Sequence, residues 1–139
     1  AMWTRLGVKT TLYAETKALY LPRAFKRDVS AFLLGWQPAS NDAQNTLWAL
    51  LNTPANDGRG RFNLGGYANP KLDELTREIG VEIDASKRQQ LMKAAWQQVQ
   101  DDLPLLPLHN QNLAWGVKRS IDVVQQPDNS QPLRYIHVR

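Results

Sequence analysis

The hydrophobic pattern of the first third of the chain predicts a strand, a helix and a second strand. Residues 8–13 alternate apolar and polar side chains and are rich in β-forming residues, as expected of a strand. Residues 15–27 carry a helical pattern, and Pro22 fits best in a first helical turn, so we expect the main helical piece to begin at residues 21–22. The continuous apolar run at 31–34 is typical of a strand buried on both faces. Together these segments predict a right-handed βαβ unit with parallel strands.

The middle of the chain predicts two amphipathic helices. Asn69 followed by Pro70 is an N-cap with proline at the first helical position, and Gly80 is a natural stop. A second helix is predicted from about Asp84 to Asp102, with apolar residues at three- and four-residue spacing on one face. This stripe consists of Leu91, Met92, Ala95, Trp96, Val99 and Leu103. We interpret these residues, the tryptophan included, as core.

The boundary between the second strand and the next helix is the predicted ligand position. Trp36 ends the apolar run, residues 37–41 form a polar loop, and Asp42 is placed to cap a helix rich in leucine. Open α/β proteins bind ligands where a buried strand meets such a loop and a helix start. Two interpretations stay open: Trp36 as a ligand contact or as a core aromatic at a strand end, and Asp42 as a ligand contact or as a helix cap.

The last third of the chain predicts strands separated by polar loops. Residues 105–108 and 113–117 are strand-like, and His109 lies in the amide-rich loop between them. A final strand is predicted over 133–138. A lone histidine in a polar loop is more often a surface or hydrogen-bonding residue than a catalyst.

Composition places the chain among ordinary globular domains. It has 139 residues, 42% of them apolar, and a formal net charge of +4 with its basic residues scattered. The absence of cysteine excludes disulfides, cysteine-based zinc sites and thiol catalysis. No run of eighteen apolar residues occurs. Residues 1–7 look like the last turn of a helix with Gly7 as its stop, and a natural chain rarely begins inside a helix. We therefore expect a fragment of a longer protein.

No catalytic constellation is visible in the sequence. It lacks a histidine pair at metal-binding spacing and a nucleophile elbow, and its two histidines lie in separate segments. We therefore predict no enzyme activity, no catalytic residues, no metal site and no cofactor. The inventory of aromatic side chains beside amide-rich loops suits noncovalent recognition.

Four landmarks, in this order, carry a family resemblance. The first is the apolar run ending in tryptophan at 31–36, and the fourth is the aromatic strand at 113–117. The second landmark consists of Asn63, Gly65 or Gly66, Tyr67, Asn69, Pro70, Asp73, Glu74 and Leu75. The third consists of Asp84, Arg88, Leu91, Asp102, Pro104, Pro107 and Leu108. This chain resembles the C-terminal part of the family 5 extracellular solute-binding proteins, the oligopeptide- and dipeptide-binding group that serves ABC importers.

The resemblance implies the fold class and the domains. It implies an α/β fragment of a two-lobed, type II periplasmic-binding-protein-like fold, with a βαβ unit, two long helices and C-terminal strands. Residues 1–119 would be part of the second lobe, and residues 120–139 a crossover tail returning to the first lobe. The final strand would then lose its native partners. We expect the tail beyond about Ser120 to be disordered or to pair with another copy through exposed strand edges.

The resemblance also implies a function and a site. It implies capture of a peptide or similar small solute in an interlobe cleft, for delivery to the permease subunits of an ABC importer. The location would be the periplasm, or the outer face of a Gram-positive membrane through a lipid anchor. The candidate ligand-binding residues are Trp36, Gln37, Ala39, Ser40, Asn41 and Asp42.

The identity of the solute stays open at this point. In the family, an aspartate of this loop can pair with the ammonium of a bound peptide, and Ala39 stands at its position. Only Asp42 could substitute for it. Members of the family also carry nickel chelates, haem, oligosaccharides and opines.

Two other functions compete with solute capture. One is a basic interaction or nucleic-acid-binding module, which needs a coherent basic face, whereas the sequence spreads its charges over several elements. The leading hypothesis therefore includes no nucleic-acid partner. A steep salt dependence of binding to random DNA would favour it. The other is a hydrolase with His109 as its base, which an active His109 variant would refute.

Overall fold

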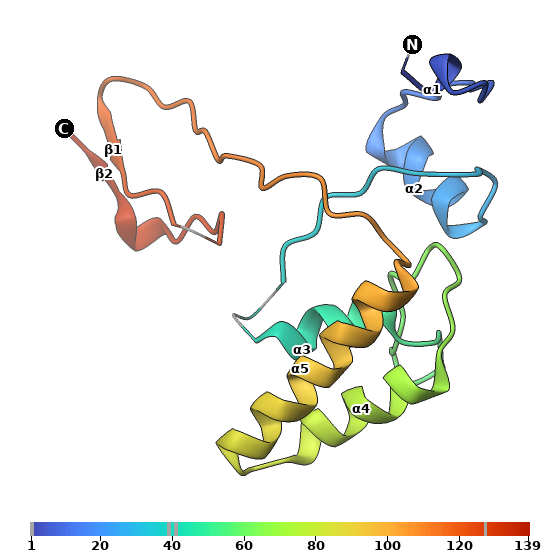
Figure 1. The fold of residues 1–139 in the computed structure, drawn as a ribbon. Coiled ribbons are helices and arrows are strands. Elements are labelled where there is room, and N and C mark those ends of the chain that lie inside the picture. The colour runs from blue at the N-terminus through green and yellow to red at the C-terminus, as the bar shows by residue number, and fades with distance from the viewer. Residues whose placement is uncertain (1, 39, 41, 127) are drawn as a thin grey trace.

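The computed structural model describes residues 2–38, 40, 42–126 and 128–139. Figure 1 shows the elements in chain order. They are α1 (Met2–Arg5), α2 (Lys17–Phe25), α3 (Ala43–Thr46), the π-helix η1 (Leu47–Leu51), α4 (Pro70–Val81), α5 (Ala85–Asp102), β1 (Ile121–Val123), the 3₁₀-helix η2 (Leu133–Tyr135) and β2 (Ile136–Val138). No helix in the described part of the chain combines the length and the apolar composition needed to cross a membrane.

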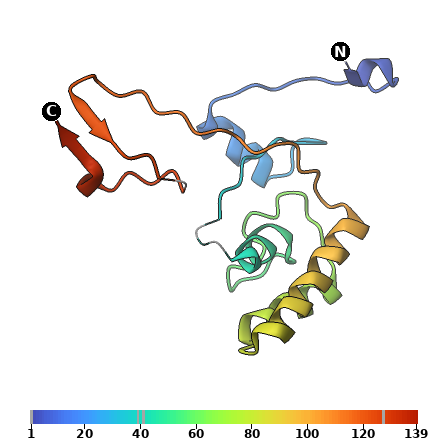
Figure 2. The same cartoon turned by 60° about the vertical axis from the view of Figure 1, so that its left-hand side comes forward.

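The core lies where α3, η1, α4 and α5 pack together, which we call the helical unit. Figures 1 and 2 show α5 lying along α4, with α3 against the same pair. The buried apolar side chains of this cluster are Leu47, Leu51, Leu72, Ile79, Ala95 and Val99. Leu91, Met92 and Trp96 pack against it half-buried, so the predicted stripe of α5 faces the core, except for Leu103, which is 62% exposed at the end of the helix.

Local capping fixes the ends of the two long helices. The side chain of Asn69 accepts hydrogen bonds from two backbone N–H groups of the first turn of α4, and Pro70 is the first residue of that helix. Asp84 accepts from the backbone N–H of Lys87 at the start of α5. At its other end α5 stops at Leu103, which has the left-handed φ of 48°. Both helices are confirmed to within about a residue of their predicted bounds.

The prediction of an N-terminal βαβ unit is wrong for the described residues. Residues 8–13 and 31–36 are extended but form no ladder with a neighbouring strand, and most of their side chains are exposed. Leu33, expected inside a sheet, is 70% exposed. A strand satisfies its backbone N–H and C=O groups only by pairing with another strand, and no other described segment pairs with either of these two.

The helix between these segments also differs from expectation. It begins at Lys17 and continues through Pro22 instead of starting there. The contacts around the proline favour an unbroken helix: Ala24 is buried, and the hydroxyl of Tyr20 donates to the carbonyl of Leu33 at 2.7 Å. These contacts offset the backbone hydrogen bond that proline removes.

The C-terminal part forms a separate hairpin. The predicted strands at 105–108 and 113–117 are extended but unpaired, for the same reason as the N-terminal ones. β1 and β2 pair antiparallel, with Val123 opposite Ile136 and Ile121 opposite Val138. The expectation that the final strand lacks a partner within the chain is therefore wrong. An ion pair between Arg139 and Asp122 closes the open end of this hairpin.

Candidate functional site

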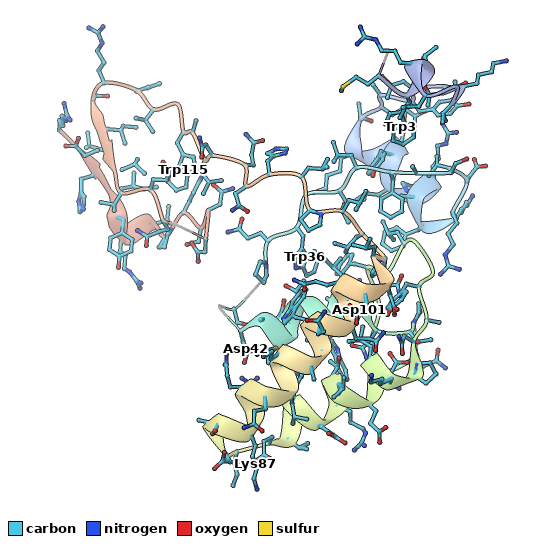
Figure 3. All side chains as sticks on the ribbon, viewed as in Figure 1. Trp3, Trp36, Asp42, Lys87, Asp101 and Trp115 are labelled. Carbon is cyan, nitrogen blue, oxygen red and sulfur yellow. The ribbon has the colours of Figure 1, made fainter. Side chains whose placement is uncertain are left out.

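The predicted ligand loop runs from the end of the 31–36 segment to the start of α3. Figure 3 shows Trp36 near the helical unit and Asp42 at the beginning of α3. Gln37 and Ser40 are exposed on the loop. Ala39 and Asn41, two of the candidate residues, lie outside the residues that the structure describes.

Trp36 is held in place by contacts to two other segments. Its indole Nε1 donates a hydrogen bond to Thr46 Oγ1 at 3.2 Å. Its ring lies 5.4 Å from the ring of Phe62, centroid to centroid, at an interplanar angle of 54°. Phe62 in turn contacts Phe25 at the end of α2, at 6.4 Å. The half-buried indole therefore joins the extended segment to α3 and to the 52–67 loop, which supports its interpretation as a packing aromatic.

Asp42 is confirmed as a helix cap. Its Oδ1 accepts the backbone N–H of Gln44 at 2.9 Å, the hydrogen bond expected of an N-cap. Its Oδ2 accepts from the Nη2 of Arg88 at 2.6 Å. The hydrogen bond from Gln44, supported by the charge of Arg88, holds the pKa of this carboxyl below its ordinary value although partial burial opposes the shift. Both carboxylate oxygens are thus engaged within the protein.

Arg88 connects three helices through this contact. Its Nε donates to the carbonyl of Ile79, near the end of α4, at 3.1 Å, while its Nη2 holds the cap of α3. Arg88 itself lies in the first turns of α5. It forms part of the third landmark, but the sequence assigned it no role because its partner Asp42 is 46 positions away. It fixes the start of the helix that follows the candidate loop.

A local hydrogen bond joins Ser40 to Asp42 at the end of the loop. The Oγ of Ser40 accepts the backbone N–H of Asp42 at 3.4 Å. The described part of the loop thus combines the half-buried indole of Trp36 and the exposed side chains of Gln37 and Ser40 with a carboxylate that is paired with Arg88. Such groups suit noncovalent contacts to a small solute.

The second landmark shapes the 52–67 loop. The Nδ2 of Asn63 donates to the carbonyls of Asn52 at 2.9 Å and Tyr67 at 2.7 Å, and its Oδ1 accepts the backbone N–H of Tyr67 at 3.1 Å. Asn63 is 6% exposed. This buried amide therefore satisfies three backbone groups that no regular element pairs.

The same landmark also joins the beginning of α4 to the end of α5. The Tyr67 hydroxyl and the Asn69 Nδ2 both donate to Asp102 Oδ2, at 2.5 and 2.7 Å. These two donors lower the pKa of Asp102 below its ordinary value. Burial of the phenol, together with the nearby carboxylate, raises the pKa of Tyr67 to about 12. Sequence reasoning placed all three residues in motifs but did not pair them.

Asp73 completes the set of structural contacts. Its Oδ1 accepts from the Nδ2 of Asn52 at 2.9 Å and from the backbone N–H of Thr53 at 2.8 Å. The first turn of α4 thereby holds the residues that follow η1. These hydrogen bonds show that the polar residues of the second landmark stabilise the fold of this chain.

The described residues show no cluster of potential metal ligands, and His109 lies on the surface. No group of three or more histidine, aspartate or glutamate side chains with metal-binding geometry occurs among them. His109 is exposed, and its Nε2 lies 3.3 Å from the Oε1 of Gln111.

Comparisons with known proteins identify relatives of one kind. The chain is 24% identical over 119 residues, 86% of its length, to di/tripeptide-binding protein 1 of Pseudomonas aeruginosa. It is 26% identical over 94% of its length to an oligopeptide-binding protein of Bacillus subtilis, and 29% identical over 91% to heme-binding protein A of Haemophilus influenzae. The matched regions make up 22 to 23% of those relatives, so the chain spans less than a quarter of their length.

Two other comparisons gave no match. No family model matches the chain, and no solved structure matches it. The relatives that do match bear the names of peptide- and heme-binding proteins. The resemblance of this chain to the family 5 solute-binding proteins is therefore confirmed.

Proposed function

We propose that this chain is part of a solute-binding protein of an ABC importer. The whole protein would capture a peptide or similar small solute between two lobes and deliver it to the permease subunits in the membrane. It would work in the periplasm, or outside a Gram-positive membrane on a lipid anchor. The observation that carries the proposal is the similarity of 86 to 94% of the chain to peptide- and heme-binding proteins.

The exposed apolar segments support a larger assembly. Leu33 in the 31–36 segment and Leu106 and Leu108 in the 105–108 segment are each 70% exposed. Extended apolar backbone of this kind is stable in water when further strands pair with it and cover its side chains. We propose that residues of the longer protein supply those strands, and that the 31–36 segment becomes a strand of the second lobe there.

The candidate loop would then form one wall of the cleft. The candidate residues of this wall are Trp36, Gln37, Ala39, Ser40, Asn41 and Asp42. Because the carboxylate of Asp42 is engaged by Arg88 and by the cap, its contribution would be to shape the loop. Amide and hydroxyl groups would provide the direct contacts, as is usual for small-molecule sites, and Trp36 would hold the loop in place through Thr46 and Phe62.

The test begins with the full-length protein. Mass spectrometry of small molecules that copurify with it identifies candidate solutes, and calorimetry measures their affinity. We expect Gln37→Ala to weaken binding of the best candidate severalfold, because its exposed side chain belongs to the proposed wall. Gln89→Ala, an exposed glutamine on α5, is the matched control and should leave affinity unchanged.

A double replacement tests the site more severely. Trp36→Ala with Asp42→Ala removes both the aromatic contact and the cap that orders the loop. Full retention of affinity in that variant would refute the site assignment. Failure of any peptide, haem or other small solute to bind the full-length protein would refute the proposed function itself.

A further inference from the structure

A basic hollow lies between the end of α2 and the 54–64 segment, and no described residue of the candidate loop lines it. Its volume is about 290 Å³, at the small end of the range for ligand pockets. Three arginines, Arg27, Arg59 and Arg61, line it together with the apolar side chains of Phe25 and Leu64. Guanidinium groups beside apolar surface attract anions more strongly than they would in open water.

Arg27 is oriented by backbone groups. It has the left-handed φ of 56°, and its Nε donates to the carbonyl of Leu64 at 3.2 Å. Its guanidinium lies so close to Gly66 that a Cβ there would be 2.8 Å from Cζ. The side chain is thus held at the hollow without a carboxylate partner, since no ion pair in the described part of the chain involves Arg27.

The other two arginines add positive charge to the hollow. Arg59 pairs with Asp57 at 2.8 Å, and its guanidinium lies 5.8 Å from the centre of the Trp48 ring. Arg61 lies near the ring of Phe62, at 5.7 Å, and among the described residues it forms no ion pair. Three guanidinium groups face one paired carboxylate, so the hollow carries an excess of positive charge.

The backbone beneath these side chains has a fixed shape. Gly60 has a positive φ of 60° and is buried, and a Cβ on it would lie 2.2 Å from the carbonyl oxygen of Asn52. Its N–H donates to the carbonyl of Trp48 at 2.8 Å. The segment that carries Arg59 and Arg61 is therefore anchored to η1 and does not need a ligand to order it.

We propose that this hollow binds a small oxyanion, the carboxylate or phosphate group of a low-molecular-weight ligand. Arg27 and Arg61 donate to the anion, and Arg59 supplies charge from the edge. This inference does not depend on the proposed solute capture, because it uses none of the candidate loop residues.

The experiment is a titration of the 139-residue protein followed by NMR of its backbone amides. Inorganic phosphate and succinate are added separately, and sodium chloride at the same ionic strength is the reference. We expect saturable shifts of the amides of Gly58, Gly60 and Arg61 with at least one of the two oxyanions. Shifts with phosphate alone assign a phosphate group, and shifts with succinate alone or with both assign a site that accepts carboxylates.

Charge-neutral variants test the assigned residues. Arg61→Gln and Arg27→Gln should each weaken binding by about twofold to fivefold, as expected for partly exposed ion pairs. Arg119→Gln, an exposed arginine in the turn before β1, removes the same charge and should leave affinity unchanged. Absence of saturable shifts with both oxyanions, equal shifts in chloride, or wild-type affinity of Arg61→Gln would overturn the proposal.

Discussion

Replacement of Asn63 by alanine gives the most direct test of the structural role of the second landmark. The side chain is 6% exposed and makes three hydrogen bonds, to the carbonyls of Asn52 and Tyr67 and from the N–H of Tyr67. Each such bond contributes about 1 kcal/mol, and the partners left behind are largely shielded from water, so the expected loss is about 3 kcal/mol. For a chain of this size that corresponds to a fall in the melting temperature of about 10 °C.

Urea unfolding followed by circular dichroism measures this loss. Asn56→Ala is the matched control, since Asn56 is exposed in the same loop and its side chain makes no hydrogen bond among the described residues, so its effect should stay within about 0.5 kcal/mol. Asn63→Asp should destabilise at least as much as Asn63→Ala, because a carboxylate would face two carbonyl oxygens. A loss below about 1 kcal/mol for Asn63→Ala would refute the assigned role.

Three further predictions concern other contacts of the helical unit and its loops. Arg88→Met should cost about 1–2 kcal/mol, and a double-mutant cycle with Asp42→Asn should give a coupling of about 0.5–1 kcal/mol; strictly additive losses would contradict the bridge. The pKa of Tyr67 is raised to about 12, so the folded state keeps its proton while the unfolded chain ionises near 10. The stability that this shift adds is present below pH 10 and lost as the pH rises toward 12. Between pH 9 and 11, the free energy of unfolding measured in urea should therefore fall less steeply with pH in Tyr67→Phe than in the wild type; an equally steep fall would refute this. Gly60→Ala should cost about 2–5 kcal/mol through its positive φ and its backbone clash, whereas Gly58→Ala, with open space around it, should cost only about 1–2 kcal/mol in the same unfolding assay; equal losses would contradict the close approach.

The long helices were predictable because their signals are local. An asparagine followed by proline begins α4, and an aspartate begins α5, each through a hydrogen bond that spans two or three residues. Apolar spacing then identified the buried face of each helix. The cap formed by Asp42 could be predicted for the same reason.

The extended segments were not predictable because pairing is not local. Residues 31–34 have the composition of a buried strand, yet composition does not supply the neighbouring strand that would satisfy its backbone. The hairpin of β1 and β2 shows the converse case. Its two strands are only three residues each, and the chain brings them together across a connection that the sequence pattern did not pair.

The site could be predicted only in part, for a related reason. The sequence marked Arg88, Asn63 and Asp102 as members of motifs but could not connect them to partners 46, 4 and 35 positions away. A motif residue and a ligand residue look alike in one sequence when both are polar. Burial separates them: the side chain of Asn63 is 6% exposed, and Gln37 is exposed on the loop.

The landmarks that reveal the relatedness of this chain therefore report on its architecture more than on its solute. Asn63, Tyr67, Asn69 and Asp73 hold one loop and two helices together through hydrogen bonds within the chain. The relatives bear the names of di/tripeptide-, oligopeptide- and heme-binding proteins, whose ligands share little chemistry. We therefore expect solute selectivity to be set by the loop at 36–42, whose helix cap is maintained by Asp42 and Arg88.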